Sequence, residues 1–234
     1  MRRLLPTPIE EVPDEALPAL FAFAGASRWV RGSMVASLDG AVRGRDGSSR
    51  SIASDADRRV FSLLRRDCDV ILVGAGTVRE ERYRPSIHPI AVVTRTLDLP
   101  ADVPLFTQRD ERTPRTLALT TARAAEQSSA DLGDALDIIV CGDVDVDLHV
   151  AIDALVDRGL CRIHCEGGPR LLTSLATADL LDELLLTVSP LLVGTPDDDH
   201  IVAAERRFER PIHLTTTQVL EEDGTVFLRS GRQP

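Results

Sequence analysis

Short apolar runs bounded by glycines or polar residues recur along the middle of the chain. Such runs are typical of strands buried on both faces of a sheet. Segments that fit helices, 121–129, 147–158 and 169–177, separate several of them. This alternation predicts an α/β fold with a mostly parallel central sheet flanked by helices. The runs read DVILVGAG, IAVVT, TLALT, LDIIV and RIHC.

The two ends of the chain follow other patterns. The stretch 14–24 reads as a helix closed by Gly25, and WVRGSMVASLDG as a strand that ends in a turn. Near the C-terminus, DELLLTVSPLLVG and IHLTTTQVLEEDGTVFLRS are rich in strand-forming residues. Asp223-Gly224 between two β-branched runs indicates a hairpin, so an antiparallel edge should complete the sheet.

A further helix is expected in SDADRRVFSLLRRD, with Ser54 as N-cap and acids in its first turn. Its buried face would carry Val60, Phe61, Leu63 and Leu64. DGSSRSIAS and residues 98–115 read as loops. We expect residues 1–28 to form an N-terminal extension with a helix, and 29–234 to form a single domain.

Composition narrows the function. The chain has 234 residues, 43% of them hydrophobic, and a formal net charge of −10. That charge argues against nucleic acid and anionic membranes as partners, because both need a basic face. No uninterrupted apolar run reaches the ~18 residues of a membrane span. The chain contains no lysine, which excludes lysine Schiff-base chemistry, and four cysteines without a disulfide framework suggest a reduced, cytoplasmic protein.

The stretch HCEGGPRLL, residues 164–172, allows two interpretations. One is half of a zinc-deaminase site, because His164-Cys165-Glu166 has the form H-x-E. Such a site also needs P-C-x-x-C downstream, and no cysteine follows Cys165. Cys161 and Cys165 share a strand face as ordinary core cysteines do. We therefore expect no metal.

The other interpretation is a phosphate-binding turn. RIHC would be a strand, Gly167-Gly168 a tight turn, and Pro169 the first residue of a helix. Free backbone amides and the helix dipole attract anions there. VGAGTVREE offers a second strand and glycine turn, with Thr77 as a possible cap of a short helix. Two such turns in one α/β sheet favour a nucleotide cleft at the carboxyl ends of the strands.

The order and spacing of these motifs carry a family resemblance. SLDG, DGSSRSIAS, a helix with LLR, ILVGAGTV, EGGPRLL and DELLLTVSPLLVG follow one another along residues 29–230. In this the chain resembles the reductase domain of the riboflavin-pathway pyrimidine deaminase-reductases. The resemblance implies a dihydrofolate-reductase-like fold, a homodimer and NADPH as cofactor. The implied reaction reduces the ribosylamino side chain of 5-amino-6-(5-phosphoribosylamino)uracil, or of a close analogue, to ribitylamino.

The resemblance also implies roles for individual residues. Glu81 would be the catalytic residue, beside the nicotinamide, and a proton donor if burial raises its pKa. Arg95 would pair with the 2′-phosphate of NADPH. Substrate contacts would come from Ser49, Glu166 and Arg65, the last as a bidentate phosphate partner. The implied cofactor contacts are Val35, Ser51, Thr77, Arg95, Gly168, Pro169, Arg170, Leu171, Leu172, Thr173 and Ser174.

The chain departs from the family pattern after the second glycine turn. Where the family commonly has L-x-D-D-P-x-L-T-x-R, the chain reads REERYRPSIHP. Glu81 replaces the first aspartate, and His88 falls nearest to the missing arginine, for which Arg82 or Arg84 would substitute. Two other functions therefore stay open: an NADPH-dependent reductase of another heterocycle such as a dihydropterin, and a non-catalytic NADPH-binding protein.

Overall fold

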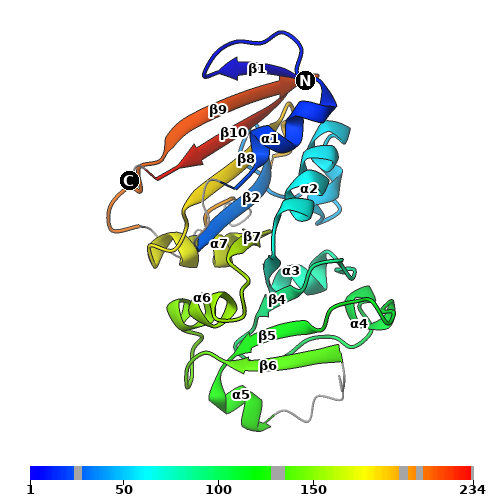
Figure 1. The fold of residues 1–234 in the computed structure, drawn as a ribbon, viewed down its shortest axis with the longest axis vertical. Coiled ribbons are helices and arrows are strands. Elements are labelled where there is room, and N and C mark those ends of the chain that lie inside the picture. Colours follow the sequence, from blue (N-terminus) through cyan, green and yellow to red (C-terminus); the bar gives the residue numbers. More distant parts are fainter. Residues whose placement is uncertain (24–27, 128–134, 195–199, 204–207, 233–234) are drawn as a thin grey trace.

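The computed structural model describes residues 1–23, 28–127, 135–194, 200–203 and 208–232. A single ten-stranded sheet runs through the molecule (Figure 1), in the order β1-β9-β10-β8-β2-β7-β3-β4-β5-β6. Its strands are β1 (Arg2–Leu5), β2 (Trp29–Ser37), β3 (Val70–Gly74), β4 (Ile90–Val93), β5 (Thr116–Thr120), β6 (Leu136–Val140), β7 (Arg162–Cys165), β8 (Glu183–Ser189), β9 (Thr215–Glu222) and β10 (Thr225–Gly231).

Seven neighbouring strands, from β8 through β2, β7, β3, β4 and β5 to β6, run parallel. The hairpin β9–β10 and strand β1 add an antiparallel edge. The expected fold class, a mostly parallel α/β sheet with an antiparallel C-terminal hairpin, is confirmed. Asp223 and Gly224, at the predicted turn, both adopt the positive φ that a tight hairpin requires.

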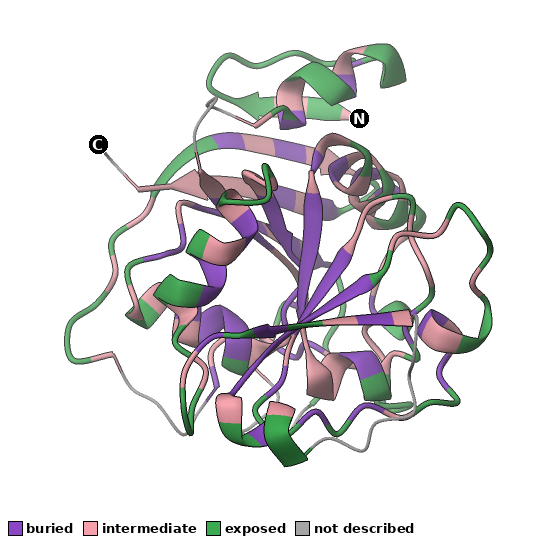
Figure 2. Ribbon diagram, turned by 60° about the horizontal axis from the view of Figure 1, so that its bottom comes forward, coloured by how far each residue is buried: buried purple, intermediate pink, exposed green. Residues whose placement is uncertain are grey.

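Helices cover both faces of the sheet, and buried residues concentrate on the strands between them (Figure 2). Alternation along β3 divides its side chains between two clusters, because successive residues point to opposite faces. Val70 and Leu72 pack with α6 and α7, whereas Ile71 and Val73 pack on the other side with Val78 of α3. The helices are α1 (Leu17–Phe21), α2 (Asp55–Asp67), α3 (Ala75–Glu80), α4 (Pro104–Thr107), α5 (Ala122–Gln127), α6 (Leu148–Val156) and α7 (Pro169–Thr177).

Several predicted elements differ in detail. The N-terminal helix is a 3₁₀ turn, Asp14–Ala16, followed by α1, and it ends at Phe21; Ala24 and Gly25 lie outside the described residues. Thr77 lies within α3, whose N-cap is Gly74, so its predicted capping role is wrong. The expected loop 98–115 contains α4. Strand β1 was not predicted, because its pattern RRLL has no alternation that marks a buried face.

Other local predictions are confirmed, because side chains within a few neighbouring residues determine these features. Ser54 accepts a hydrogen bond from the Asp57 backbone N–H at 3.1 Å, which caps α2. Of the four apolar residues predicted for the buried face of α2, Val60 and Leu64 are fully buried, and Phe61 and Leu63 are half-buried. Helix α7 has the predicted bounds, with Pro169 at its first position.

The N-terminal segment is fastened by a buried ion-pair network. Arg31 of β2, with no exposed surface, donates from Nε to Glu183 at 2.5 Å and from a terminal nitrogen to the Phe21 carbonyl at 2.7 Å. Arg229 of β10 donates to the other oxygen of Glu183 and to the Leu20 carbonyl. One buried carboxylate thus balances two arginines that hold the end of α1 against the sheet.

We predict that Glu183→Gln lowers the free energy of unfolding by about 3 kcal/mol, because it leaves the buried guanidinium group of Arg31 and the half-buried one of Arg229 without a counter-charge. Urea unfolding of the ligand-free protein measures this change. Asp55→Asn is the matched control: Asp55 forms an exposed ion pair with Arg58, and its loss should have no measurable effect. Equal stability of the Glu183 variant and the native protein would refute the prediction.

Candidate active site

The site lies where the carboxyl ends of β2, β7, β3 and β4 meet, since these strands are neighbours in the sheet. The two glycine turns found in the sequence follow β3 and β7. They lie side by side, because the Gly74 backbone N–H donates to the Gly167 carbonyl at 3.0 Å. Ligands of parallel sheets collect at this edge. The sheet order therefore brings together motifs that are almost a hundred residues apart.

The larger of two cavities at this edge, of about 1050 Å³, is here called the α7 cavity. Its floor is formed by the β3–α3 turn and by the first turn of α7. A side chain at Gly76 would meet no protein atom within 4 Å, so the backbone is open there. Its lining includes Gly74, Ala75, Gly76, Thr77, Arg79, Thr94, Arg95, Asp145, His149, Gly168, Pro169, Arg170, Leu171 and Ser174.

The second cavity, of about 420 Å³, lies between α2 and the sheet and is called the α2 cavity. It is more apolar on its walls, with Met34, Val35 and Phe61, yet it carries several charged groups. The two cavities share five lining residues, so they adjoin each other at the glycine turns. The shared residues are Arg43, Thr77, Glu80, Gly168 and Pro169.

A buried ion pair joins the walls of the α2 cavity. Arg65 of α2 donates from Nε and from one terminal nitrogen to the two oxygens of Glu166, each at 2.6 Å. The Glu166 side chain is only 1% exposed. The phenol of Tyr83 donates to the same carboxylate. Glu166 therefore has its charge balanced and its oxygens occupied by protein groups.

Electrostatics follow from this burial. Burial opposes the charge of Arg65, but hydrogen bonds and attraction from Glu166 outweigh it and raise the pKa of the guanidinium. Burial, with the negative charge of Glu166, raises the pKa of Tyr83 well above its usual value. His164, two residues before Glu166 in the chain, is fully buried, and burial lowers its pKa to about 4. The site thus holds a charged arginine, a neutral phenol and a neutral imidazole near pH 7.

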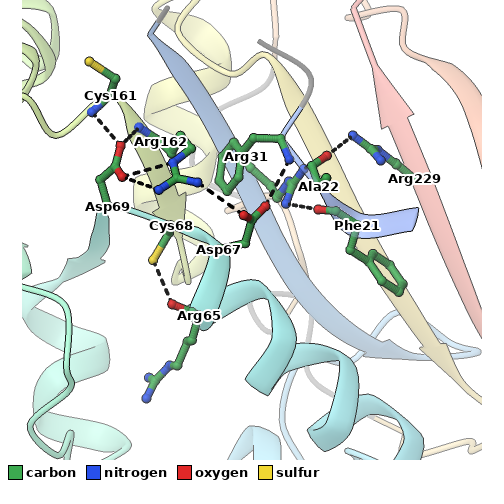
Figure 3. Close-up of polar contacts among 11 residues, drawn as sticks. Phe21, Ala22, Arg31, Arg65, Asp67, Cys68, Asp69, Cys161, Arg162 and Arg229 are labelled. Carbon is green, nitrogen blue, oxygen red and sulfur yellow. Dashed lines mark hydrogen bonds and ion pairs between the residues drawn. The ribbon is translucent and has the colours of Figure 1, made fainter. Parts of the chain in front are cut away.

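The corner after α2 fixes the position of Arg65 (Figure 3). Asp69 accepts from the backbone N–H groups of Cys161 and Arg162, at 3.1 and 2.7 Å, and from the Arg162 side chain. Arg162 also reaches Asp67, the last residue of α2, at 3.3 Å. Helix α2 is therefore tied to the start of β7, whose other end carries Glu166.

Glu81 occupies a different environment from the one expected for a proton donor. Its carboxylate accepts from the Ser48 hydroxyl at 3.0 Å and from the Ser49 backbone N–H at 2.9 Å. Both carboxylate oxygens of Glu81 are thus engaged by protein groups rather than directed at a ligand position. Glu81 lines the α2 cavity, but its contacts are those of an anchor for the loop 48–51. Its predicted catalytic role receives no support from this geometry.

The other residues implied by the resemblance divide into three groups. Val35, Ser49, Arg65 and Glu166 line the α2 cavity. Ser51 lies outside both cavities, exposed, and donates to Asp46 at 2.7 Å, so its geometry gives no support to a cofactor contact. The remaining predicted positions form the α7 cavity or its support: Thr77, Arg95, Gly168, Pro169, Arg170, Leu171 and Ser174 line it, whereas Leu172 and Thr173 are buried behind it.

One expectation about a single residue needs correction, and the geometry of the Gly167-Gly168 turn adds a detail. The bidentate fork of Arg65 holds Glu166, so it is not free to hold a phosphate in the same way. Gly168 has an ordinary φ of −74°, and the residue with positive φ is Gly167, at +87°. A Cβ atom added at Gly168 would lie 2.9 Å from the hydroxyl oxygen of Thr77.

Sequence reasoning missed several residues of the α2 cavity. Tyr83 is the single tyrosine of the chain, which makes it conspicuous, but nothing in its neighbours points to Glu166, 83 positions away. Asp57 was only one of the acids in the first turn of α2, yet it lines the cavity. Arg43 and Glu80, which pair at 2.7 Å, lie where the cavities join. Among the described residues, no group of acidic, histidine and cysteine side chains is arranged to hold a metal ion.

This organisation defines an α/β protein with two adjacent cavities at the carboxyl edge of its parallel strands, one bordered by glycine turns and a helix N-terminus and the other with more apolar walls and balanced charges. The model of the RibD C-terminal domain family matches residues 28–226, and the chain belongs to that family. The family expected from the order of the motifs is thereby confirmed.

Relatives agree with this assignment. The 2,5-diamino-6-ribosylamino-4(3H)-pyrimidinone 5′-phosphate reductase of Methanothermobacter thermautotrophicus is 30% identical over 177 residues, which cover 72% of this chain and 80% of that protein. A pyrimidine reductase-like protein from Corynebacterium diphtheriae has a similar structure, with a TM-score of 0.76, 21% identity, and coverage of 94% of this chain and 98% of that chain.

A longer protein shares the fold. The deaminase and 5-amino-6-(5-phosphoribosylamino)uracil reductase of Thermotoga maritima gives a TM-score of 0.69 at 16% identity, over 88% of this chain and 56% of that chain. Among the residues that the structure describes, no helix is long and apolar enough to cross a membrane.

We predict that Arg65→Ala lowers the free energy of unfolding by about 3 kcal/mol in the absence of any ligand, because Glu166 stays buried without its counter-charge. Thermal or urea unfolding of the ligand-free protein measures it. Arg84→Ala, on the rim of the same cavity, serves as the control and should leave stability unchanged. If Arg65→Ala has native stability, Glu166 does not depend on the ion pair and Arg65 is available to a ligand.

Proposed function

We propose that the protein is an NADPH-dependent reductase of the riboflavin-pathway type. Its substrate would be a phosphorylated ribosylaminopyrimidine, whose ribosylamino side chain is reduced to ribitylamino. The observation that carries the proposal is the junction of the two cavities at Thr77, Gly168 and Pro169. A dinucleotide in the α7 cavity would end at this junction, and a pyrimidine in the α2 cavity would face it.

The residues of the α7 cavity fit a dinucleotide. The N-terminus of α7, nine residues long, presents backbone N–H groups to the cavity. The open backbone at Gly76 allows close approach of a phosphate. Arg95 lies on the rim, and its loose, exposed pairing with Asp145, at 3.5 Å, leaves it available to a 2′-phosphate. NADPH supplies a hydride when it is bound.

In this proposal the chain's own groups bind and orient. Such positioning is a large part of catalysis when two reactants must meet in one geometry. Arg65, Glu166 and Tyr83 form a rigid wall that fixes the shape of the α2 cavity. Of the two arginines expected to replace the family's missing one, Arg84 lines the cavity and Arg82 pairs with Asp102 outside it. Arg84 is therefore the proposed partner of the substrate phosphate. The cytoplasmic location and the homodimer remain predictions.

The function is tested by following NADPH oxidation with the phosphorylated 2,5-diamino-6-ribosylaminopyrimidinone and with its uracil counterpart. Turnover of either substrate, with the ribitylamino product identified by mass, supports the proposal. Tight NADPH binding without turnover of either would instead support a non-catalytic binding protein.

Cofactor preference gives a second prediction. The native protein should bind NADPH more tightly than NADH, and Arg95→Ala should weaken NADPH binding by about tenfold or more while leaving NADH binding unchanged, because a charge-assisted hydrogen bond contributes about 1.5–3 kcal/mol. Fluorescence titration measures both affinities. Asp145→Asn is the matched control: it removes the carboxylate that competes for Arg95 and should not weaken NADPH. Equal native affinities for the two cofactors would contradict this assignment.

The open backbone at Gly76 gives a third prediction. Gly76→Val should weaken cofactor binding by about tenfold or more, since its side chain would occupy the space proposed for a phosphate. The thermal midpoint should change little, because no protein atom lies near the added Cβ. Gly76→Ala should give a smaller effect in the same titration. Native affinity in a folded Gly76→Val protein would remove this turn from the cofactor site.

A further inference from the structure

Asp57 is a charged residue of the α2 cavity that the family resemblance does not assign. It lies in the first turn of α2, and its backbone N–H donates to Ser54. Asp57 lines the α2 cavity and also the small space beside it that Thr187 of β8 lines, and the Thr187 hydroxyl favours the ionised form of its carboxyl group. A hydroxyl supplies only one donor, whereas a carboxylate has about four lone-pair positions.

The other carboxylates that line this cavity are occupied. Glu166 is held by Arg65 and Tyr83, Glu81 by the loop 48–51, and Glu80 by Arg43 at 2.7 Å. Within the described part of the chain, Asp57 alone among the four forms no salt bridge. Its neighbour Arg58, which also lines the cavity, pairs with Asp55 at 2.5 Å and attracts Asp57 without forming a salt bridge with it.

The surroundings of Asp57 are partly apolar. Val60, Phe61 and Leu185 line the small space beside it, together with Ser33. Burial there raises the pKa of the Asp57 carboxyl. A desolvated carboxyl without a cationic partner is unfavourable until hydrogen-bond donors reach it. In this cavity the remaining donors would come from a bound molecule.

We propose that Asp57 binds the 2-amino group and the adjacent ring N–H of a 2-aminopyrimidin-4-one, and so makes the enzyme prefer an amino-substituted ring to a uracil. This inference rests on the proposed function and specifies its substrate. The aminopyrimidinone edge presents two parallel N–H donors, which match the two oxygens of a carboxylate. The corresponding uracil edge presents an N–H between two carbonyl groups, and a carboxylate repels those oxygens.

The proposal predicts a reversal of preference in one isosteric variant. The native enzyme should have a kcat/KM about 100-fold higher for the phosphorylated diaminopyrimidinone than for its uracil counterpart, because hydrogen bonds to a charged group are lost and oxygens are opposed. Asp57→Asn replaces one acceptor by a donor, which matches the uracil edge. Asp57→Asn should reduce kcat/KM for the diaminopyrimidinone by about 100-fold and leave kcat/KM for the uracil compound unchanged or higher.

Steady-state NADPH oxidation with both substrates measures these values, on native protein, on Asp57→Asn and on Asp55→Asn. The last variant carries the same substitution two residues away on the exposed side of α2 and should behave as native. A dihydropterin, which has the same 2-amino-4-oxo edge but no ribosyl phosphate, forms a third arm. The native enzyme could reduce the dihydropterin and neither phosphorylated compound, and Asp57→Asn could abolish that activity. This result would support recognition of the 2-amino-4-oxo edge by Asp57 and would replace the proposed substrate with a dihydropterin.

The outcomes separate the two proposals. If the native enzyme reduces the uracil compound as fast as the diamino compound, or faster, that result overturns the role of Asp57 and leaves the reductase function in place. The same holds if Asp57→Asn lowers both values equally while it still binds NADPH and unfolds at the native temperature. If Asp57→Asn does not fold, the native preference alone decides. No turnover of any of the three compounds refutes the reductase function itself.

Discussion

The ion pair between Arg65 and Glu166 is the interaction on which the site depends. It joins helix α2 to the end of β7, immediately before the glycine turn that opens the α7 cavity. Tyr83, from the segment after α3, donates a hydrogen bond to the same carboxylate. Three separate parts of the chain thus meet at one buried charge. Because a buried charge is unfavourable without all of its partners, the three must keep one arrangement.

That arrangement places two cavities of different character side by side. The α7 cavity is built from backbone, with glycine turns and a helix N-terminus, and suits a phosphate-bearing cofactor. The α2 cavity is built from side chains whose charges are nearly all balanced within the protein. A ligand there would be recognised by the few groups whose hydrogen-bonding capacity is not filled, which is why Asp57 and Arg84 carry more of the proposed specificity than Glu81 or Glu166.

The sheet itself explains why chemistry gathers at this edge. Strands β2, β7, β3 and β4 run parallel, so their carboxyl ends lie at the same side. The antiparallel edge serves another purpose: through Arg229 and Glu183 it holds the N-terminal helix against α2. The binding site and the anchor of the N-terminal helix are therefore separate parts of one structure, although each contains a buried ion pair that stabilises the fold.

The sequence by itself determined the local structure. Apolar runs gave the strands, Ser54 and Pro169 gave two helix starts, Asp223-Gly224 gave the hairpin, and the order of motifs gave the family. These signals are contained in a few neighbouring residues, where backbone preference and hydrophobic burial act directly. Strand β1 carried no such signal and was missed, because pairing with β9 alone makes it a strand.

Only the tertiary structure decided which candidate site residues are free to act. The sequence identified Arg65, Glu166 and Glu81 as residues of interest, but not that the first two neutralise each other or that the third holds a loop. It gave Asp57 no more weight than the other acids at the start of its helix. Whether a charged side chain meets a partner or a cavity depends on contacts between elements far apart in the chain. The free energy of that charge is set by those contacts and by burial, neither of which residue type or spacing encodes.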